Sequence, residues 1–252
     1  GINSAVNVGG TATLSAVNGI TQGAAGSITA NTLVLGSSNS GTNKPSVDLS
    51  TASNYITNLQ ASNVSALTLS NSQALTVNSS GISATGAVSL NTFTNDLLVA
   101  GGISTASSLS LTGRTLSLAA NITTTGAQHY AELVVLDNAL AATVLNTSNS
   151  SVTFDKAIVN ADSTSPQDLT INVGSGYVTF TGLVGEDSNG TYGALGDLVI
   201  NSAGVTTFVS TVDAASLKTD VTGINASTTG NKVVIQGGRI TTTGEQHYAE
   251  LV

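Results

Sequence analysis

The sequence has 252 residues and contains no cysteine, no methionine and no tryptophan. Without cysteine it can form no disulfide, no thiol nucleophile and no cysteine-based zinc or iron–sulfur site. Six lysine and arginine residues are too few to follow a phosphate backbone, which argues against nucleic-acid binding. Two histidines leave little material for acid–base catalysis near neutral pH.

Charge is scarce as well, since only 8% of the residues are charged and the net charge is −8. Disordered chains combine high net charge with low hydrophobicity, whereas 40% of this sequence is hydrophobic. Valine, leucine, isoleucine and alanine recur at regular intervals, and no apolar run reaches the roughly 20 residues of a membrane-spanning helix. The composition therefore predicts a folded, acidic chain that does not cross a membrane. No signal peptide is visible at the start.

One segment is repeated almost unchanged. Residues 122–134 recur as residues 240–252, and 12 of the 13 positions agree. In the first copy an apolar strand continues through Val135 and Leu136. We therefore expect the chain to be a fragment of a longer protein that continues beyond Val252.

Shorter periods lie within this long repeat. In the first half, pairs of apolar residues separated by one position recur at a nearly constant step, at Leu67 and Leu69, Val88 and Leu90, and Leu109 and Leu111. In the second half the step lengthens, as the positions of Phe154, Phe180 and Phe208 show. Alternation with period two indicates strands, and the intervening Gly, Asn, Ser and Asp indicate turns.

Short strands with a fixed long period predict an all-β parallel β-helix, or β-solenoid, of about eleven coils stacked about 4.8 Å apart. We expect coils of about 21 residues over 1–121 and longer coils over 122–252, where the long repeat restarts at 240. Together they would form one continuous rod. An antiparallel sandwich also has short strands, but it predicts neither a fixed period nor the duplicated segment.

The motifs between residues 120 and 252 resemble the repeats of very large secreted bacterial adhesins of the filamentous-haemagglutinin type. In those repeats a T-T-G-x-Q-x-Y segment, here residues 124–130, is followed by V-T-F and L-x-I segments, here at 152–154 and 169–171. Residues 1–120 are similar only in general style. The resemblance implies a right-handed parallel β-helix that is exported across the outer membrane and works at the cell surface in adhesion, biofilm or structure. It implies no catalytic residues.

Tyrosine and histidine in the repeat are the first candidates for a site. His129 and Glu132 could ligate a metal, but on an extended strand they would point to opposite faces. A turn or an outward strand position set by the repeat is the favoured interpretation. Tyr130, its counterpart Tyr248, and Tyr192 are the candidates for facing a ligand. Packing at an edge is the favoured alternative for Tyr130.

Glu186, Asp187 and Asn189 form the densest acidic turn, followed by Gly190. Oxygen ligands at short spacing make it a candidate for weak Ca²⁺ binding, although it lacks the EF-hand pattern. A solvated acidic loop is the favoured interpretation. Because loops that interrupt coils often carry binding surfaces, residues 186–194 are also a candidate binding face. We expect no other metal or cofactor.

Two further patterns bear on function. Asp168 and Asp197 precede similar strands and would stack if the step between them makes one coil, but a repeated turn residue explains them without catalysis. The threonine runs at 123–125 and 241–243 suggest an ice-binding surface, but threonine does not recur at every coil. We therefore expect no enzymatic activity.

The sequence as a whole indicates a non-catalytic segment of an extracellular bacterial adhesin or surface-fibre protein that serves as a structural stalk. The alternative is a module that binds glycan or itself, with surface polysaccharide or other copies of the chain as partners. A polysaccharide-cleaving β-helix enzyme is the remote alternative.

Overall fold

The computed structural model describes residues 1–37, 43–137, 142–185, 191–219, 231–249 and 252. Over these residues the chain is an all-β parallel β-solenoid, as predicted, and it has about nine turns whose regular elements are strands. The described residues contain no helix that is long and apolar enough to cross a membrane.

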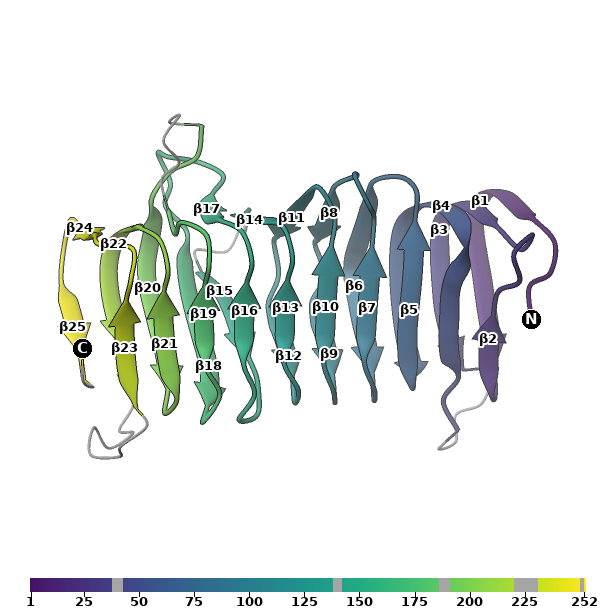
Figure 1. Ribbon diagram of the computed structural model, residues 1–252. Helices are drawn as coiled ribbons and strands as arrows, with labels where there is room; N and C mark the ends of the chain where they lie inside the picture. Colours follow the sequence, from purple (N-terminus) through teal and green to yellow (C-terminus); the bar gives the residue numbers. More distant parts are fainter. Residues whose placement is uncertain (38–42, 138–141, 186–190, 220–230, 250–251) are drawn as a thin grey trace. The chain divides into compact units, whose positions relative to one another are not determined.

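The chain divides into two compact units, Gly1–Leu116 and Ser117–Val252. In each unit the chain passes in turn through two parallel sheets, which we call sheet 1 and sheet 2 (Figure 1). Sheet 1 holds one strand from each turn. In sheet 2, a turn contributes either one long strand or two short strands in succession, as β8 and β9 do opposite β6.

In the first unit, sheet 1 contains β2 (Gly19–Thr21), the beginning of β4 (Ser46–Val64), β5 (Ala66–Asn71), β7 (Val88–Asn91) and β10 (Leu109–Thr112). Sheet 2 contains β1 (Val6–Ala16), β3 (Ile28–Ser37), the rest of β4, β6 (Leu75–Ala84), β8 (Leu97–Val99) and β9 (Ile103–Thr105). The register is the one expected from the sequence, since Leu67 pairs with Val88 and Val88 with Leu109.

In the second unit, sheet 1 contains β13 (Gln128–Tyr130), β16 (Val152–Phe154), β19 (Val178–Phe180), β21 (Val205–Phe208) and β23 (Lys232–Ile235). Sheet 2 contains β12 (Ile122–Thr124), β14 (Leu133–Leu136), β15 (Ala142–Asn146), β17 (Ile158–Asn160), β18 (Asp168–Gly174), β20 (Leu195–Ser202), β22 (Val212–Thr219), β24 (Ile240–Thr242) and β25 (Gln246–Tyr248). The short β11 (Thr115–Leu118) spans the boundary between the units.

The expected number of turns is too high, because the short period of the first half does not extend to the start of the chain. Gly19 pairs with Ser46, a longer step along the chain than the one from Leu67 to Val88. Strands there are also longer, and β4 alone has 19 residues. Longer turns divide the same chain into about nine coils rather than eleven.

Residues that alternate along the strands point inward. In the core, these side chains stack on their counterparts in the neighbouring coils. The largest stack consists of four parallel rings in the second unit, Tyr130, Phe154, Phe180 and Phe208. Neighbouring ring centroids lie 4.9 to 5.2 Å apart, which is close to the spacing of hydrogen-bonded strands. One ring per coil therefore fills the interior behind sheet 1 without a gap.

In the first unit, buried polar side chains line the corner where the chain leaves sheet 1 for sheet 2. We call Gln22, Asn54, Asn71 and Thr92 the corner ladder; each is at least nine-tenths buried. Asn54 Nδ2 donates to the carbonyls of Leu49 and Ser70 at 2.9 and 3.0 Å, which links its own coil to the next. Asn71 repeats the pattern with the carbonyl of Ile56 at 2.9 Å. Internal bonds thus offset the cost of burying these groups.

Candidate functional site

The prediction that Tyr130 faces a ligand is wrong. Its side chain is fully buried and stacks on Phe154 with an angle of 10° between the ring planes. The phenol donates to Gln128 Oε1 at 2.8 Å, and burial raises the pKa of the Tyr130 hydroxyl above its ordinary value. The ring belongs to the core, because Gln128 supplies the hydroxyl with a partner inside the solenoid.

The other predicted site residues stay untested. Tyr248 is half-buried on β25 and donates to Gln246 Oε1 at 3.2 Å, and Tyr192 is also half-buried. The calcium candidates Glu186, Asp187 and Asn189 lie outside the described residues. Among the described residues, no three histidine, aspartate or glutamate side chains lie close enough together to hold a metal ion.

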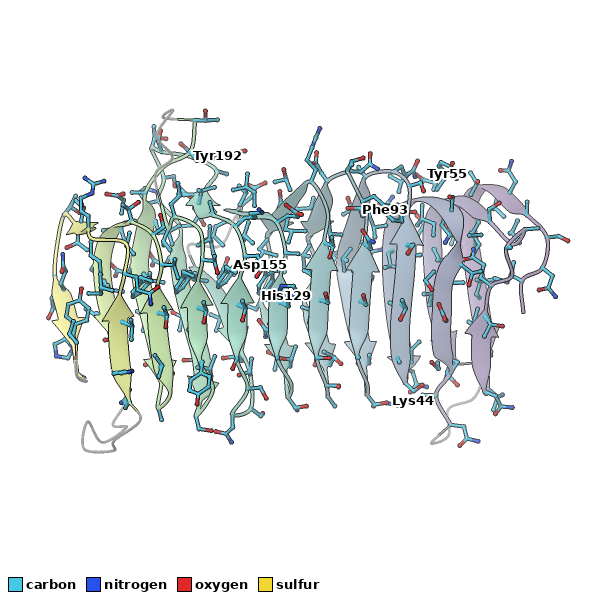
Figure 2. The ribbon with its side chains drawn as sticks, in the orientation of Figure 1. Lys44, Tyr55, Phe93, His129, Asp155 and Tyr192 are labelled. Atoms are coloured by element: carbon cyan, nitrogen blue, oxygen red, sulfur yellow. The ribbon has the colours of Figure 1, made fainter. Side chains whose placement is uncertain are left out.

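His129 lies on the outer face of sheet 1 and reaches the next coil. Its Nε2 atom lies 2.7 Å from Asp155 Oδ2, and both side chains are a little under half exposed. Figure 2 shows the two side chains close together, on neighbouring coils in which β13 pairs with β16. This contact crosslinks two coils on the outside, opposite the internal ring stack.

Asp168 and Asp197 lie one coil apart, as predicted, because Leu169 pairs with Leu198. Asp168 Oδ1 accepts the backbone N–H of Asp197 at 2.7 Å, and Asp197 Oδ1 accepts the Ser216 hydroxyl at 2.6 Å. Each carboxylate therefore holds the coil that follows it. Both lie within strands, Asp168 at the start of β18 and Asp197 inside β20, rather than in turns as the sequence suggested.

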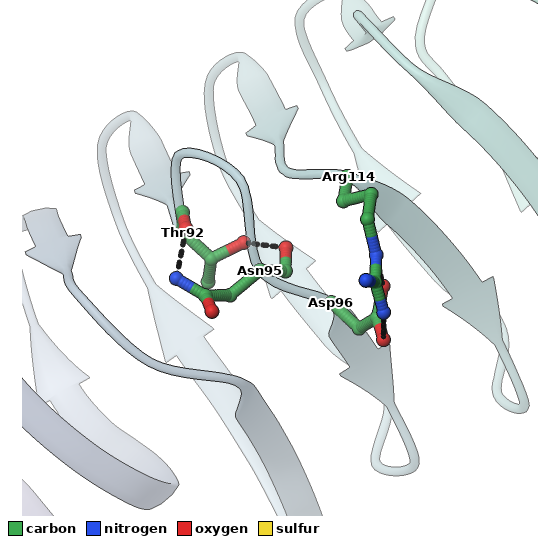
Figure 3. Close-up of polar contacts among 4 residues, drawn as sticks. All are labelled: Thr92, Asn95, Asp96 and Arg114. Atoms are coloured by element: carbon green, nitrogen blue, oxygen red, sulfur yellow. Dashed lines mark hydrogen bonds and ion pairs between the residues drawn. The ribbon is translucent and has the colours of Figure 1, made fainter.

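A further polar cluster occupies the turn after β7 (Figure 3). Thr92 Oγ1 donates to the carbonyl of Asn95 at 2.7 Å, and Asn95 Nδ2 donates back to the carbonyl of Thr92 at 3.1 Å. Arg114 then binds Asp96 with two bonds, from Nε at 2.9 Å and from Nη2 at 2.5 Å. The Arg114 guanidinium lowers the pKa of Asp96 below its ordinary value, mainly through these hydrogen bonds.

Replacing Arg114 by glutamine is expected to return the pKa of Asp96 to its ordinary range. Because the pKa is depressed only in the folded state, the pair stabilises the fold above the unfolded pKa, near 3.8, and this contribution is lost as pH falls through the lowered folded value. The Arg114 side chain is about two-thirds exposed and that of Asp96 nearly half, so R114Q should cost less than about 1 kcal/mol at pH 7. Titration of the Asp96 carboxyl carbon by NMR measures the pKa directly. An unchanged pKa in R114Q would contradict the assignment.

Two exposed aromatic side chains stand beside the corner ladder, and the sequence did not single them out. Tyr55 directly follows Asn54 and is 45% exposed; Phe93 directly follows Thr92 and is 51% exposed. Phe93 has a φ of 55°, a left-handed conformation that is rare for a bulky residue. Figure 2 shows both residues near the upper edge of the coils. An aromatic residue next to a corner amide or hydroxyl is the sequence signal that could have identified them.

Tyr55 also borders a groove of about 280 Å³ on the outside of the first unit. Its lining comes from three neighbouring strands of sheet 2 and the turn after β5, namely Asn7, Val8, Gly9, Thr29, Ala30, Asn31, Tyr55, Thr57 and Gln73. Asn7 pairs with Thr29 and Thr29 with Tyr55, so these outward side chains form one row across three coils. The groove combines concavity, an aromatic ring and several hydrogen-bonding groups.

No protein-family model, curated protein or solved structure matches this chain. Any functional argument therefore starts from the solenoid architecture and the surface described above.

Proposed function

We propose that this chain is a non-catalytic structural segment of an extracellular bacterial adhesin or surface fibre. The observation that carries the proposal is the parallel pairing of successive coils within each unit. Each coil is bonded to its neighbours by backbone hydrogen bonds and by an internal stack of side chains such as Phe154, Phe180 and Phe208.

The chemistry of the coils suits a load-bearing role outside the cell. Backbone bonds between parallel coils run along the stacking direction, so a pulling force would be shared by many bonds at once. A chain without cysteine forms no stray disulfides in an oxidising compartment. The resemblance of residues 124–130 and the V-T-F segments to secreted adhesin repeats supports the same interpretation.

Location and size test this proposal. An antibody raised against the chain should label intact cells of the native producer in immunogold electron microscopy, without permeabilisation. On a denaturing gel it should detect a polypeptide far larger than 24.9 kDa. Labelling only after permeabilisation, or only in the cytoplasmic fraction, would overturn the extracellular role.

Absence of catalysis is part of the proposal and has its own experiment. Incubating the chain with polygalacturonate, alginate or cellulose, with and without millimolar Ca²⁺, should release no reducing ends above a boiled control. An increase that depends on Asp168 or Asp197, lost in D168N or D197N, would instead favour a polysaccharide-cleaving enzyme.

A further inference from the structure

The groove beside Tyr55 belongs to a longer row of outward side chains in the first unit. Asn7, Thr29 and Tyr55 occupy three successive coils. Gln73 follows in the turn after β5, and Phe93 follows in the equivalent turn after β7, the strand that pairs with β5. Coils stack about 4.8 Å apart, so Tyr55 and Phe93, two coils apart, are separated by about 10 Å along the stack.

The groove offers an aromatic ring together with amide and hydroxyl groups. The ring of Tyr55 is nearly half exposed, and Asn7, Asn31 and Gln73 contribute amides. Thr29 and Thr57 add hydroxyls, and Val8 borders the groove, whereas Ala30 is buried in the core. A sugar ring has an apolar face of C–H bonds and a rim of hydroxyls. An exposed aromatic ring with several uncharged donors and acceptors matches both parts.

None of the described residues that line this surface carries a charged side chain. Lys44 and Asp48 are the only charged side chains in the sequence from 1 to 95, and neither belongs to the groove lining. Within the groove a sulfated or uronic polysaccharide would find no basic partner and a cationic ligand no acidic one, and beside Phe93 the charges of Asp96 and Arg114 are paired with each other. The ligand that fits is therefore uncharged.

The floor of the groove is open where β1 passes under it. A side-chain carbon added at Gly9 would meet no atom within 4 Å, and the same is true of Gly10. Gly9 lines the groove, whereas Gly10 does not. A ligand can therefore approach the backbone closely at Gly9.

The walls are held in place by bonds within and between coils. Asn54, which precedes Tyr55, is fully buried and bonded on both sides. Gln73 Nε2 donates to Thr57 Oγ1 at 3.2 Å, and Asn58 Nδ2 donates to the carbonyl of Asn31 at 3.1 Å. These contacts fix the direction of the groove walls before a ligand arrives, which lowers the entropic cost of binding.

We propose that this surface binds a neutral polysaccharide whose chain runs along the stack of coils. One sugar ring stacks on Tyr55 while its hydroxyls bond to Asn7, Asn31 and Gln73. Phe93 provides a second platform about 10 Å further along, roughly two sugar units away. The proposal is independent of the structural role proposed above, because a stalk needs no ligand.

The test is affinity electrophoresis of the full 252-residue chain in native gels that contain a dissolved polysaccharide. Hydroxyethyl cellulose, laminarin and galactomannan serve as neutral probes, with polygalacturonate and heparin as charged probes. At least one neutral probe should retard the chain, and about 0.5 M NaCl should not abolish the retardation, since no ion pairs are involved. Retardation by charged probes alone, or by none, would overturn the proposal.

Variants then locate the site. With the probe that binds, Y55A should weaken binding at least tenfold, because the stacking ring is lost. G9Q places a long side chain at the groove, where its Cβ meets no atom within 4 Å, and should also weaken binding at least fivefold. G10Q is the matched control on the same strand and should bind like the wild type. Equal binding by wild type, Y55A and G9Q would place the ligand elsewhere.

Oligosaccharide length tests the second platform. Isothermal titration of F93S should show unchanged affinity for a disaccharide of the bound polymer but at least threefold weaker affinity for its hexasaccharide. Equal losses for both lengths would remove Phe93 from the proposed row. Failure of all these binding experiments leaves the immunogold and gel results unaffected, so the two proposals fail separately.

Discussion

Replacing Phe180 by alanine is expected to lower the free energy of unfolding by about 3–5 kcal/mol. Phe180 is an interior ring of the four-membered stack, and both of its faces are covered. Its centroid lies 5.1 Å from that of Phe154 and 5.2 Å from that of Phe208, and only 1% of its surface is exposed. Alanine would leave a cavity with the two neighbouring rings on opposite sides, and the strands that carry them cannot close it without breaking their register.

Urea unfolding of the full chain, followed by circular dichroism, measures this loss. Thr179→Ala is the matched control, because Thr179 lies on the same strand with its side chain directed outward, and it should change the free energy by less than about 0.5 kcal/mol. F180L should fall between the two. A loss below about 1 kcal/mol in F180A would contradict a close-packed stack.

The register of this stack could be predicted from the sequence, whereas one of its members could not. The spacing of Phe154, Phe180 and Phe208 indicates one ring per coil, and the pairing of their three strands follows that spacing. From the sequence, Tyr130 is a candidate for facing a ligand or for packing at an edge, not a member of the interior stack. Their polar ends are satisfied internally, since Gln128 Nε2 donates to the carbonyl of Asn146 at 2.8 Å.

The two copies of the duplicated segment show that nearly identical sequences do not have to lie in the same sheet. In the first copy, Gln128–Tyr130 lies in sheet 1 and pairs with β16. In the second copy, Gln246–Tyr248 lies in sheet 2 and pairs with β22. Both copies follow a strand of sheet 1, β10 or β23, but two strands, β11 and β12, separate β10 from β13, whereas β24 alone separates β23 from β25. Nearly identical residues thus occupy different places in a coil.

The groove escaped prediction for a related reason. Asparagine and threonine are so frequent here that no single one stands out, and only the fold shows which are buried. Asn54 is fully buried while Asn7 and Asn31 line the outside, although all three occur in similar sequence surroundings. Burial depends on partners from other coils, such as Gln22, which bonds to Asn54 from the preceding coil.

Replacing Asn54, a member of the corner ladder, by leucine should lower the free energy of unfolding by about 4 kcal/mol. Asn54 Oδ1 accepts from the backbone N–H of Ile28 at 2.9 Å and from Gln22 Nε2 at 2.6 Å. Its Nδ2 donates to the carbonyls of Leu49 and Ser70. Leucine fills the same space but leaves these buried groups without partners, and each such group costs about 1–3 kcal/mol.

Thermal and urea unfolding of N54L measure the effect, with N58A as the control. Asn58 makes a side-chain bond at the surface, and its loss should cost about 0.5 kcal/mol. The comparison with Y55A separates structure from binding at adjacent positions: Y55A should keep the stability of the wild type and lose polysaccharide binding, whereas N54L should lose both. Wild-type stability in N54L would mean that the corner ladder does not hold the coils together. The orientation of the Tyr55 side chain would then have to be fixed by contacts other than those of Asn54.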